Sequence, residues 1–241
     1  MEFDSNALNN IKKIKDYYDD LLKNIEIEAT KSSRAYGGYI RAFKGELVEY
    51  IARELVKIAW VDLLKQDYNR IDINKRKMPV IMTNKHKYID NIESKEVRDF
   101  LTEHKEEQIY KFGTDEQVFV DGKLVLPIEC KAYTENAMLK RILFDAKLMK
   151  ELTGCQTYYL LQLESQLGGD YSSLNEIIYG SKSSNALMSQ VDVKLNIITL
   201  LKGERNIQEP IHDPKYFKEL EINQLKKACI EFAKALKPYA K

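Results

Sequence analysis

Apolar side chains recur every three or four positions in four long stretches of the chain. This spacing places them on one face of an α-helix, so it predicts helices over residues 5–30, about 43–65, 135–152 and about 216–237. The stretch between the first two, KSSRAYGGYIRAFK (31–44), is rich in Ser, Gly and basic residues. We therefore expect a loop there that leads into the second helix.

From residue 108 the apolar positions change to a period of two, which is typical of strands. QIYKF, EQVFV and KLVLPIECK follow one another, with Asp121-Gly122 as the expected turn of a hairpin. TYYLLQLES and VDVKLNIITLL predict two further buried strands, separated by a polar insertion over 165–190. Residues 66–108 predict a strand, at MPVIMT, and helices. The order of elements favours one α/β domain over 1–241.

Length and composition support a globular protein and limit its class. The 241 residues are 44% hydrophobic, and the formal net charge is +1, so no overall charge marks a nucleic-acid-binding protein. No apolar run reaches the roughly 18 residues of a membrane span, and the start lacks the pattern of a signal peptide. We therefore expect a cytoplasmic protein without membrane contact. Its three cysteines, Cys130, Cys155 and Cys229, are expected to be buried, reduced thiols.

The strand KLVLPIECK carries two opposite charges on one side. Side chains alternate along a strand, so Glu129 and Lys131 share a face, and Asp115 comes close across the hairpin. Two carboxylates on one patch suit Mg²⁺, and a lysine beside them can orient or deprotonate water or stabilise charge on phosphorus. This chemistry fits phosphodiester hydrolysis. The alternative is a surface hairpin with an exposed salt bridge.

The same residues resemble the active-site motif of the PD-(D/E)XK nuclease superfamily, which includes type II restriction endonucleases. Thr114-Asp115, a hairpin and Ile128-Glu129-Cys130-Lys131 match the motif, although Thr114 stands where a proline is usual. A helix before the hairpin in this superfamily often contains Gly-x-x-x-Glu, and Gly45 and Glu49 match it. The angular spacing of the helix turns Glu49 inward and Glu46 toward solvent. The alternative for Glu49 is a glutamate tolerated at the helix boundary.

The resemblance implies a fold, a cofactor and a set of site residues. It implies a restriction-endonuclease-like fold, in which a central mixed β-sheet is flanked by helices, with a core over about 43–201 and added terminal helices. It implies catalysis by Asp115, Glu129, Lys131 and Glu49, and Mg²⁺ held by the three carboxylates and the backbone carbonyl of Cys130. A homodimer acting on double-stranded DNA is expected from the same resemblance.

Candidate DNA-binding residues lie outside this motif. Basic and aromatic side chains with flexible glycines suit contacts with phosphates and base edges, which favours the 31–44 stretch and the 165–190 insertion. The candidates are Arg34, Tyr36, Tyr39, Arg41, Lys44, Lys140 and Lys182. The 31–44 stretch is equally compatible with an ordinary basic turn before a helix, and Lys140 with the solvated face of one.

Taken together, the pattern predicts a Mg²⁺-dependent endonuclease of a restriction system that cuts DNA at a short specific sequence. Two alternatives remain at this point. One is a structure-specific nuclease, such as a resolvase or repair nuclease, and the other is a non-catalytic protein that binds DNA or a partner. The sequence does not give the recognition site.

Overall fold

The structure is a computed structural model of the chain. It describes residues 1–30, 36–83, 87–168, 172, 182–209 and 212–241, apart from the side chains of 26–30, 36 and 41. The chain divides into two compact units, Met1–Asn74 with Thr114–Lys241 (unit 1) and Lys75–Gly113 (unit 2). The single domain expected from the sequence stays a prediction, and each unit is described by itself.

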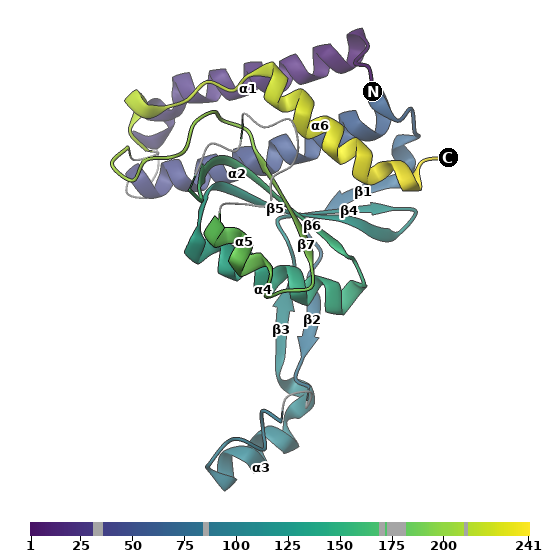
Figure 1. The fold of residues 1–241 in the computed structure, drawn as a ribbon, viewed down its shortest axis with the longest axis vertical. Helices are drawn as coiled ribbons and strands as arrows, with labels where there is room; N and C mark the ends of the chain where they lie inside the picture. Colours follow the sequence, from purple (N-terminus) through teal and green to yellow (C-terminus); the bar gives the residue numbers. More distant parts are fainter. Residues whose placement is uncertain (31–35, 84–86, 169–171, 173–181, 210–211) are drawn as a thin grey trace. The chain divides into compact units, whose positions relative to one another are not determined.

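Unit 1 is built on a five-stranded sheet in the order β1-β4-β5-β6-β7 (Figure 1). The two junctions β1–β4 and β4–β5 are antiparallel, whereas β5–β6 and β6–β7 are parallel, so the predicted mixed sheet is confirmed. The strands are β1 (Ile71–Asn74), β4 (Glu116–Val120), β5 (Lys123–Glu135), β6 (Thr157–Gln166) and β7 (Lys194–Thr199).

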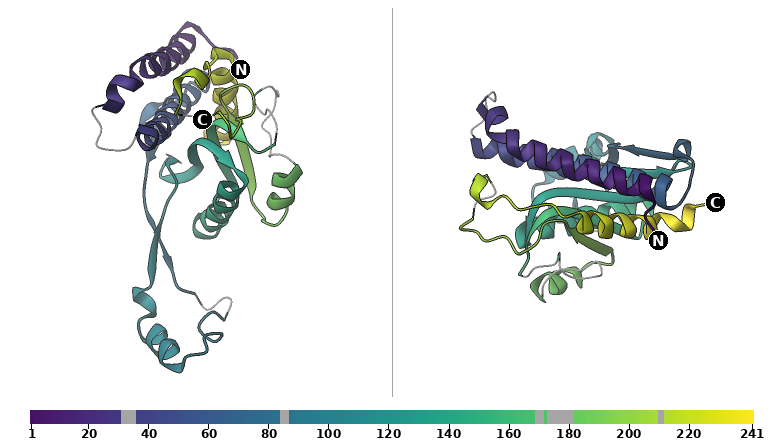
Figure 2. Two further views of the ribbon diagram at one scale, coloured as in Figure 1. Left: turned by 90° about the vertical axis from the view of Figure 1, so that its left-hand side faces the viewer. Right: turned by 90° about the horizontal axis from the view of Figure 1, so that it is seen from above.

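Helices cover both faces of this sheet (Figures 1 and 2). On one face, α1 (Ser5–Thr30), α2 (Tyr36–Lys57) and α6 (Ile222–Leu236) share a core with alternate residues of β5 and β6, including Ile128 and Leu161. On the other, α4 (Asn136–Thr153) buries its apolar stripe and connects β5 to the parallel β6, and α5 (Lys182–Met188) lies beside it. Shorter helical segments follow α2 and flank α6: η1 (Ile58–Leu63), η2 (Tyr68–Arg70), η4 (Pro214–Tyr216) and η5 (Lys237–Tyr239).

The second helix begins earlier than predicted. Residues 36–44 were expected in a loop, but α2 starts at Tyr36, and residues 31–35 lie outside the described part of the chain. Ile40 is buried against Ile25 of α1, with Tyr39 and Phe43 packed around the pair. The expectation was wrong because helical spacing of these apolar residues and their packing outweigh the low helix propensity of Gly37 and Gly38.

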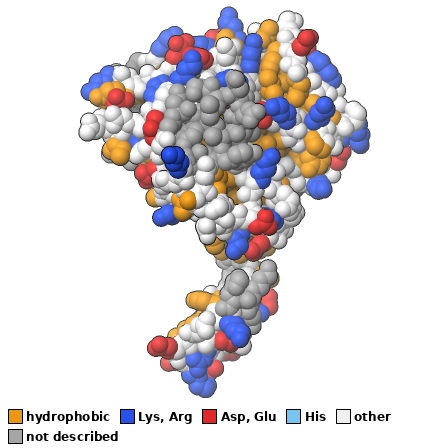
Figure 3. Space-filling view, in the orientation of Figure 1, with side chains coloured by type: hydrophobic (Ala, Val, Ile, Leu, Met, Phe, Trp, Pro, Cys, Tyr) orange, Lys and Arg blue, Asp and Glu red, His pale blue; other side chains and the backbone are white. Residues whose placement is uncertain are grey.

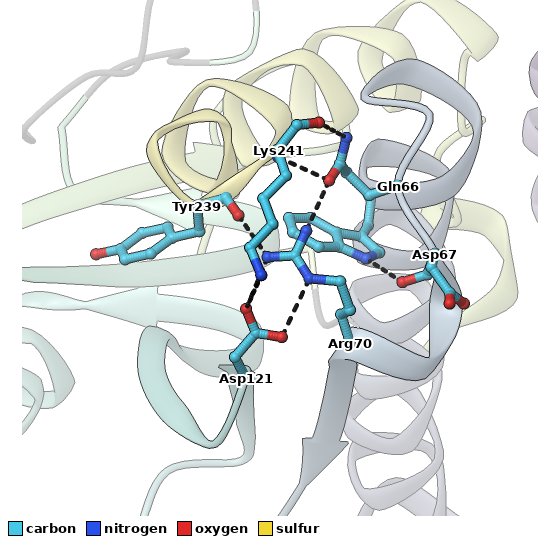
Figure 4. Close-up of polar contacts among 7 residues, drawn as sticks. Gln66, Asp67, Arg70, Asp121, Tyr239 and Lys241 are labelled. Carbon is cyan, nitrogen blue, oxygen red and sulfur yellow. Dashed lines mark hydrogen bonds and ion pairs between the residues drawn. The ribbon is translucent and has the colours of Figure 1, made fainter.

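The hairpin that carries the charged motif is fastened at its turn (Figure 4). Asp121 adopts a positive φ of 48° there, and Arg70 donates to both of its carboxylate oxygens, at 2.7 and 3.1 Å. Arg70 also donates to Gln66 and to the backbone carbonyl of Tyr239, at 2.8 and 3.0 Å. The pKa of Asp121 lies below its usual range because of the hydrogen bond from Arg70. The predicted Asp121-Gly122 turn is confirmed.

Unit 2 is an antiparallel two-stranded ribbon with a helix between its strands. β2 (Met78–Ile81) pairs with β3 (Ile109–Phe112), and α3 (Lys95–Glu103) and η3 (Lys105–Glu107) come between them. The strand predicted at QIYKF is confirmed as β3. Its partner was not predicted, because a period-two pattern identifies a strand without identifying its partner, and β3 pairs only within unit 2 among the described residues.

Two smaller expectations can also be compared with the structure. Cys130 and Cys229 are buried free thiols as predicted, whereas Cys155 is only half-buried. No helix in the described part of the chain is long and apolar enough to cross a membrane.

Candidate active site

Asp115, Glu129 and Lys131 converge as the sequence predicted. The ammonium of Lys131 donates to Asp115 Oδ2 at 2.9 Å, to Glu129 Oε1 at 2.5 Å and to the backbone carbonyl of Cys130 at 3.1 Å. The backbone N–H of Cys130 donates to Asp115 Oδ2 at 2.8 Å, which holds the start of the hairpin against β5. Three oxygens therefore surround one cationic nitrogen.

Burial and neighbouring charges together shift the pKa values of Glu129 and Lys131. Burial raises the pKa of Glu129, although Lys131 opposes the effect, and Asp115 adds to it. Burial alone would lower the pKa of Lys131, but Glu129 and Asp115 more than offset it, so this pKa lies above its ordinary value. As long as it pairs with these two carboxylates, Lys131 is held as an ammonium.

Thr114 and Glu116 fix the segment on either side of Asp115. The hydroxyl of Thr114, which stands where the family motif has proline, donates to the carbonyl of Glu116 at 2.9 Å and is buried. Glu116 is 1% exposed and forms an ion pair with Arg53 of α2. A buried carboxylate requires such a partner, so this pair ties α2 to the strand that begins beside Asp115.

Glu49 lies on the side of α2 that the spacing predicted. It is half-buried, whereas Glu46 is exposed. Burial raises the pKa of the Cys130 thiol well above its ordinary value, and the carboxylates of Asp115, Glu116, Glu49 and Glu129 raise it further. Glu49 is therefore close enough to the motif strand to act on it electrostatically.

Two polar residues near Glu129 were missed by the sequence analysis. Tyr158 of β6 is 1% exposed, and its hydroxyl donates to Glu129 Oε2 at 3.4 Å. Asp145 of α4 is half-buried; burial raises its pKa, and the charges of Arg141, Lys131 and Asp115 also act on it. The signal was weak, because Tyr158 sits in an apolar run and Asp145 among the other charges of an amphipathic helix.

A curated protein is similar to nearly the whole chain. It is "Type II restriction enzyme DdeI" of Desulfomicrobium norvegicum, 40% identical over 223 residues, which cover 90% of this chain and 92% of that protein. The chain belongs to the type II restriction enzymes. It is accordingly a site-specific deoxyribonuclease of a restriction system, and the predicted fold class and activity are confirmed.

Two other comparisons of this restriction enzyme add little to the argument. A solved structure, "native BbvCI A2B2 tetramer at low resolution", matches with a TM-score of 0.39 and 13% identity, covering 100% of this chain and 99% of that one. No family model matches the sequence.

The donor set of this restriction enzyme fits a divalent cation, which type II restriction enzymes generally use. Asp115 Oδ2, Glu129 Oε1 and the Cys130 carbonyl oxygen lie close enough together to contact one group, which in this structure is the Lys131 ammonium, so a metal ion would use their remaining lone pairs or displace that ammonium. Hard oxygen ligands of this kind suit Mg²⁺, Mn²⁺ or Ca²⁺. Among the described residues no group of three or more Asp, Glu, His or Cys side chains is placed to hold a metal ion, so Glu49 does not complete a site with Asp115 and Glu129 in this structure. Water and substrate would supply the other ligands.

The predicted DNA-binding residues of the enzyme do not form one group. Lys140 of α4 and Lys182 of α5 are exposed. Lys44 is only 2% exposed, so it cannot contact DNA in this conformation, and Tyr39 is half-buried and stacks on Phe43 with ring centroids 5.9 Å apart. Arg34 lies outside the described residues, as do the side chains of Tyr36 and Arg41. Figure 3 shows basic and acidic side chains interspersed over the visible face of unit 1.

Proposed function

We propose that this restriction enzyme hydrolyses phosphodiester bonds of double-stranded DNA with Mg²⁺ at the site of Asp115, Glu129, Lys131 and Glu49. The observation that carries the proposal is the convergence of two carboxylate oxygens and one backbone carbonyl on the Lys131 ammonium. The Lys131 ammonium shows that these oxygens can bind a positive charge together. The half-buried carboxylate of Glu49 is a further acidic group near the motif strand.

In this proposal Asp115, Glu129 and the Cys130 carbonyl hold the metal ion, with Glu49 adding a carboxylate at its periphery. Bound there, Mg²⁺ would supply Lewis-acid stabilisation of phosphate charge and a more acidic water. Tyr158 and Lys131 each engage one oxygen of Glu129, which sets the orientation of that carboxylate.

Lys131 acts in this proposal as a fixed positive charge. Its ammonium remains protonated between two carboxylates, and it stabilises the negative charge that develops on the scissile phosphate. To orient the attacking water as well, the ammonium would have to release one of its three present partners, because it has only three N–H donors. The role of general base, which the sequence left open for Lys131, stays open, because a metal ion on Asp115 and Glu129 would weaken the two charges that raise its pKa.

Family membership supports a DNA substrate and a homodimer. We infer that two copies act together on a palindromic site, as the sequence analysis expected, and that exposed Lys140 and Lys182 contact the phosphate backbone. We also infer that the enzyme acts in the cytoplasm of its host, where DNA is accessible to it.

The test is cleavage of plasmid DNA in different divalent ions. Mg²⁺ should give discrete fragments whose sequenced ends share one short motif, and EDTA should abolish cleavage. Ca²⁺, which accepts looser geometry, should support DNA binding with little cutting. Full activity in EDTA, or cleavage without a common end sequence, would contradict the proposal.

A further inference from the structure

Unit 2 exposes an unusual share of large apolar side chains. Thirteen large hydrophobic residues are exposed in the described part of the chain, and six of them lie within Lys75–Gly113. The six are Ile81, Tyr88, Val97, Phe100, Ile109 and Tyr110, which are between 43% and 61% exposed. Hydrophobic side chains also reach the surface of this unit in Figure 3. Concentrated apolar exposure of this kind marks an interaction surface.

The helix α3 is amphipathic, but it buries none of its residues. Val97, Phe100 and Leu101 follow the i, i+3, i+4 spacing of one helix face. Val97 is 43% and Phe100 53% exposed, and the ring of Phe100 rests only partly on His104, with centroids 4.5 Å apart. An apolar helix face normally packs against another element, so this one is suited to an external partner.

The ribbon β2–β3 is apolar on both of its faces. Ile81 pairs with Ile109, which puts these two exposed side chains on one face, and Val80 pairs with the exposed Tyr110 on the other. A two-stranded ribbon is marginally stable alone, and among the described residues neither strand has a second neighbour. Its outer strand edges are therefore open to pairing or packing by another chain.

Charge divides the same unit into two complementary ends. Residues 75–82 and 108–113, at the open end of the ribbon, contain four basic residues and no acidic one. Residues 83–107, between the two strands, include α3 and η3 and contain seven carboxylates and five Lys or Arg, a net charge of −2. The basic end and the acidic end therefore carry formal charges of opposite sign, +4 and −2.

We propose that unit 2 is the dimerisation arm of the enzyme, in which the arms of two copies pack antiparallel. A two-fold interface brings the same patch of both copies together, so residue i of one faces residue j of the other and the reverse. Antiparallel packing places the acidic end of each copy on the basic end of its partner, so this contact forms twice in the dimer. The apolar side chains of α3 and the ribbon lie between the two contacts. A surface whose two ends complement each other fits a second copy of itself.

The same features argue against DNA as the occupant of this surface. A β-ribbon can enter the major groove, and the four basic residues would suit phosphates. However, the carboxylates of α3 and η3 would face the same polyanion, and exposed Phe100 and Val97 would gain nothing from phosphate. The inference rests on the homodimer of the proposed function and adds the surface that forms it.

The first experiment compares Phe100→Glu with Tyr68→Glu in the full-length protein by sedimentation velocity without DNA. Both side chains are 53% exposed, but Tyr68 lies in unit 1. We expect Phe100→Glu to weaken dimerisation on the order of 30-fold or more, the effect of losing a central aromatic contact, and Tyr68→Glu to leave it unchanged. Circular dichroism and thermal melts verify that both variants fold.

The second experiment tests the antiparallel arrangement by charge reversal. Lys77→Glu with Lys111→Glu, and separately Glu103→Lys with Glu106→Lys, should each weaken the dimer. All four side chains are exposed, so folding should survive. The variant with all four reversals should dimerise close to the wild-type level, because each end again faces its opposite. A fourfold variant as weak as either double variant would overturn the arrangement.

Cleavage assays on the same proteins separate this inference from the proposed function. A wild-type protein that is monomeric with and without DNA, yet cleaves specifically, overturns the dimerisation arm and leaves the nuclease intact. Variants that keep the dimer but lose DNA affinity in Ca²⁺ overturn it in favour of a DNA-contacting arm. Dimers that depend on Phe100, in a protein that never cleaves, support the arm and count against the proposed chemistry.

Discussion

Unit 1 contains two clusters of carboxylates and lysines that differ in their balance of charge. In the first, Asp115 and Glu129 share one lysine, Lys131. In the second, one buried carboxylate, Glu164 of β6, pairs with Lys218 at 3.0 Å and also acts on Lys44. The first cluster has an excess of negative charge and the second an excess of positive charge.

The difference in balance separates a cation site from a structural ion pair. The oxygens of the first cluster converge on one point and remain partly open, since the side chains of Asp115 and Lys131 are 29% and 24% exposed. In the second, Glu164 is 4% exposed and Lys44 lies under the Phe217 ring, its nitrogen 4.3 Å from the centroid. Removing Lys131 from the first cluster should therefore leave its carboxylate oxygens available to a metal ion. Removing Lys44 from the second should reduce its excess of positive charge.

Lys131→Ala is expected to have the largest effect, and it should fall on catalysis. Loss of the fixed positive charge should lower the cleavage rate about 10²- to 10⁴-fold, because that charge acts mainly in the transition state. Folding and DNA affinity in Ca²⁺ should be retained, since the divalent ion takes over the carboxylate oxygens. Single-turnover cleavage and gel-shift titrations measure the two effects separately.

The control for this prediction is Lys12→Ala, an exposed lysine of α1. It should leave both cleavage and melting temperature at the wild-type level. If Lys131→Ala instead lowered the melting temperature in Ca²⁺ and still cleaved near the wild-type rate, the first cluster would be a structural ion pair like the second.

Glu164→Ala should have the opposite signature, with a loss of stability and little change in chemistry. The substitution leaves Lys44 and Lys218 without their carboxylate, and breaking a buried pair costs about 3–5 kcal/mol. Urea unfolding at pH 7 measures the loss, and cleavage by the folded fraction at low temperature should stay within a few fold of wild type. Exposed Glu151→Ala on α4 is the matched control.

The sequence predicted the first cluster well because local rules determine most of it. Alternation along β5 put Glu129 and Lys131 on one face, but the Asp121-Gly122 turn sets the register only as far as Phe119, and a shift between Val118 and Phe119 brings Asp115 beside Glu129. Helical angles were enough to separate inward Glu49 from outward Glu46. Apart from the register shift, these positions depend on dihedral geometry within one element or across one short turn.

The remaining features depend on how distant elements pack. The neighbours Tyr158 and Asp145 come from elements after the motif, and their approach to Glu129 requires the β5–α4–β6 crossover to be in place. Lys44 was predicted to contact DNA, but the packing of α2 near Glu164 and Phe217 buries it. A basic residue in a stretch rich in Gly and Ser gave no sign of that burial.

The helix α2 offers a smaller and more selective test of the first cluster. Glu49→Ala should lower the cleavage rate about 10- to 100-fold, as is typical when a group that supports a metal site is removed. Glu46→Ala, three positions earlier and exposed, should have no effect. The Mg²⁺ concentration for half-maximal rate should rise only for Glu49→Ala. Equal losses in both variants would show that neither carboxylate has a specific role.

Lys44→Met is expected to have the smallest effect, a gain in stability that depends on pH. Burial lowers the pKa of Lys44 to about 8; Glu164 opposes this shift, whereas Lys218 and Arg205 add to it. Since the folded pKa lies below that of an unfolded lysine, the unfolded chain binds more protons between about pH 8 and 10.5. The charged Lys44 therefore destabilises the wild type fully below pH 8, and this penalty disappears as the pH rises toward 10.5.

Methionine keeps the length of the side chain without the charge, so the variant should be more stable by about 1–2 kcal/mol at pH 7. Urea unfolding at pH 7, 8, 9 and 10 should show the two proteins converging at the alkaline end. A variant that is less stable than wild type at pH 7 would mean that Lys44 contributes more through its contacts with Glu164 and Phe217 than its burial costs.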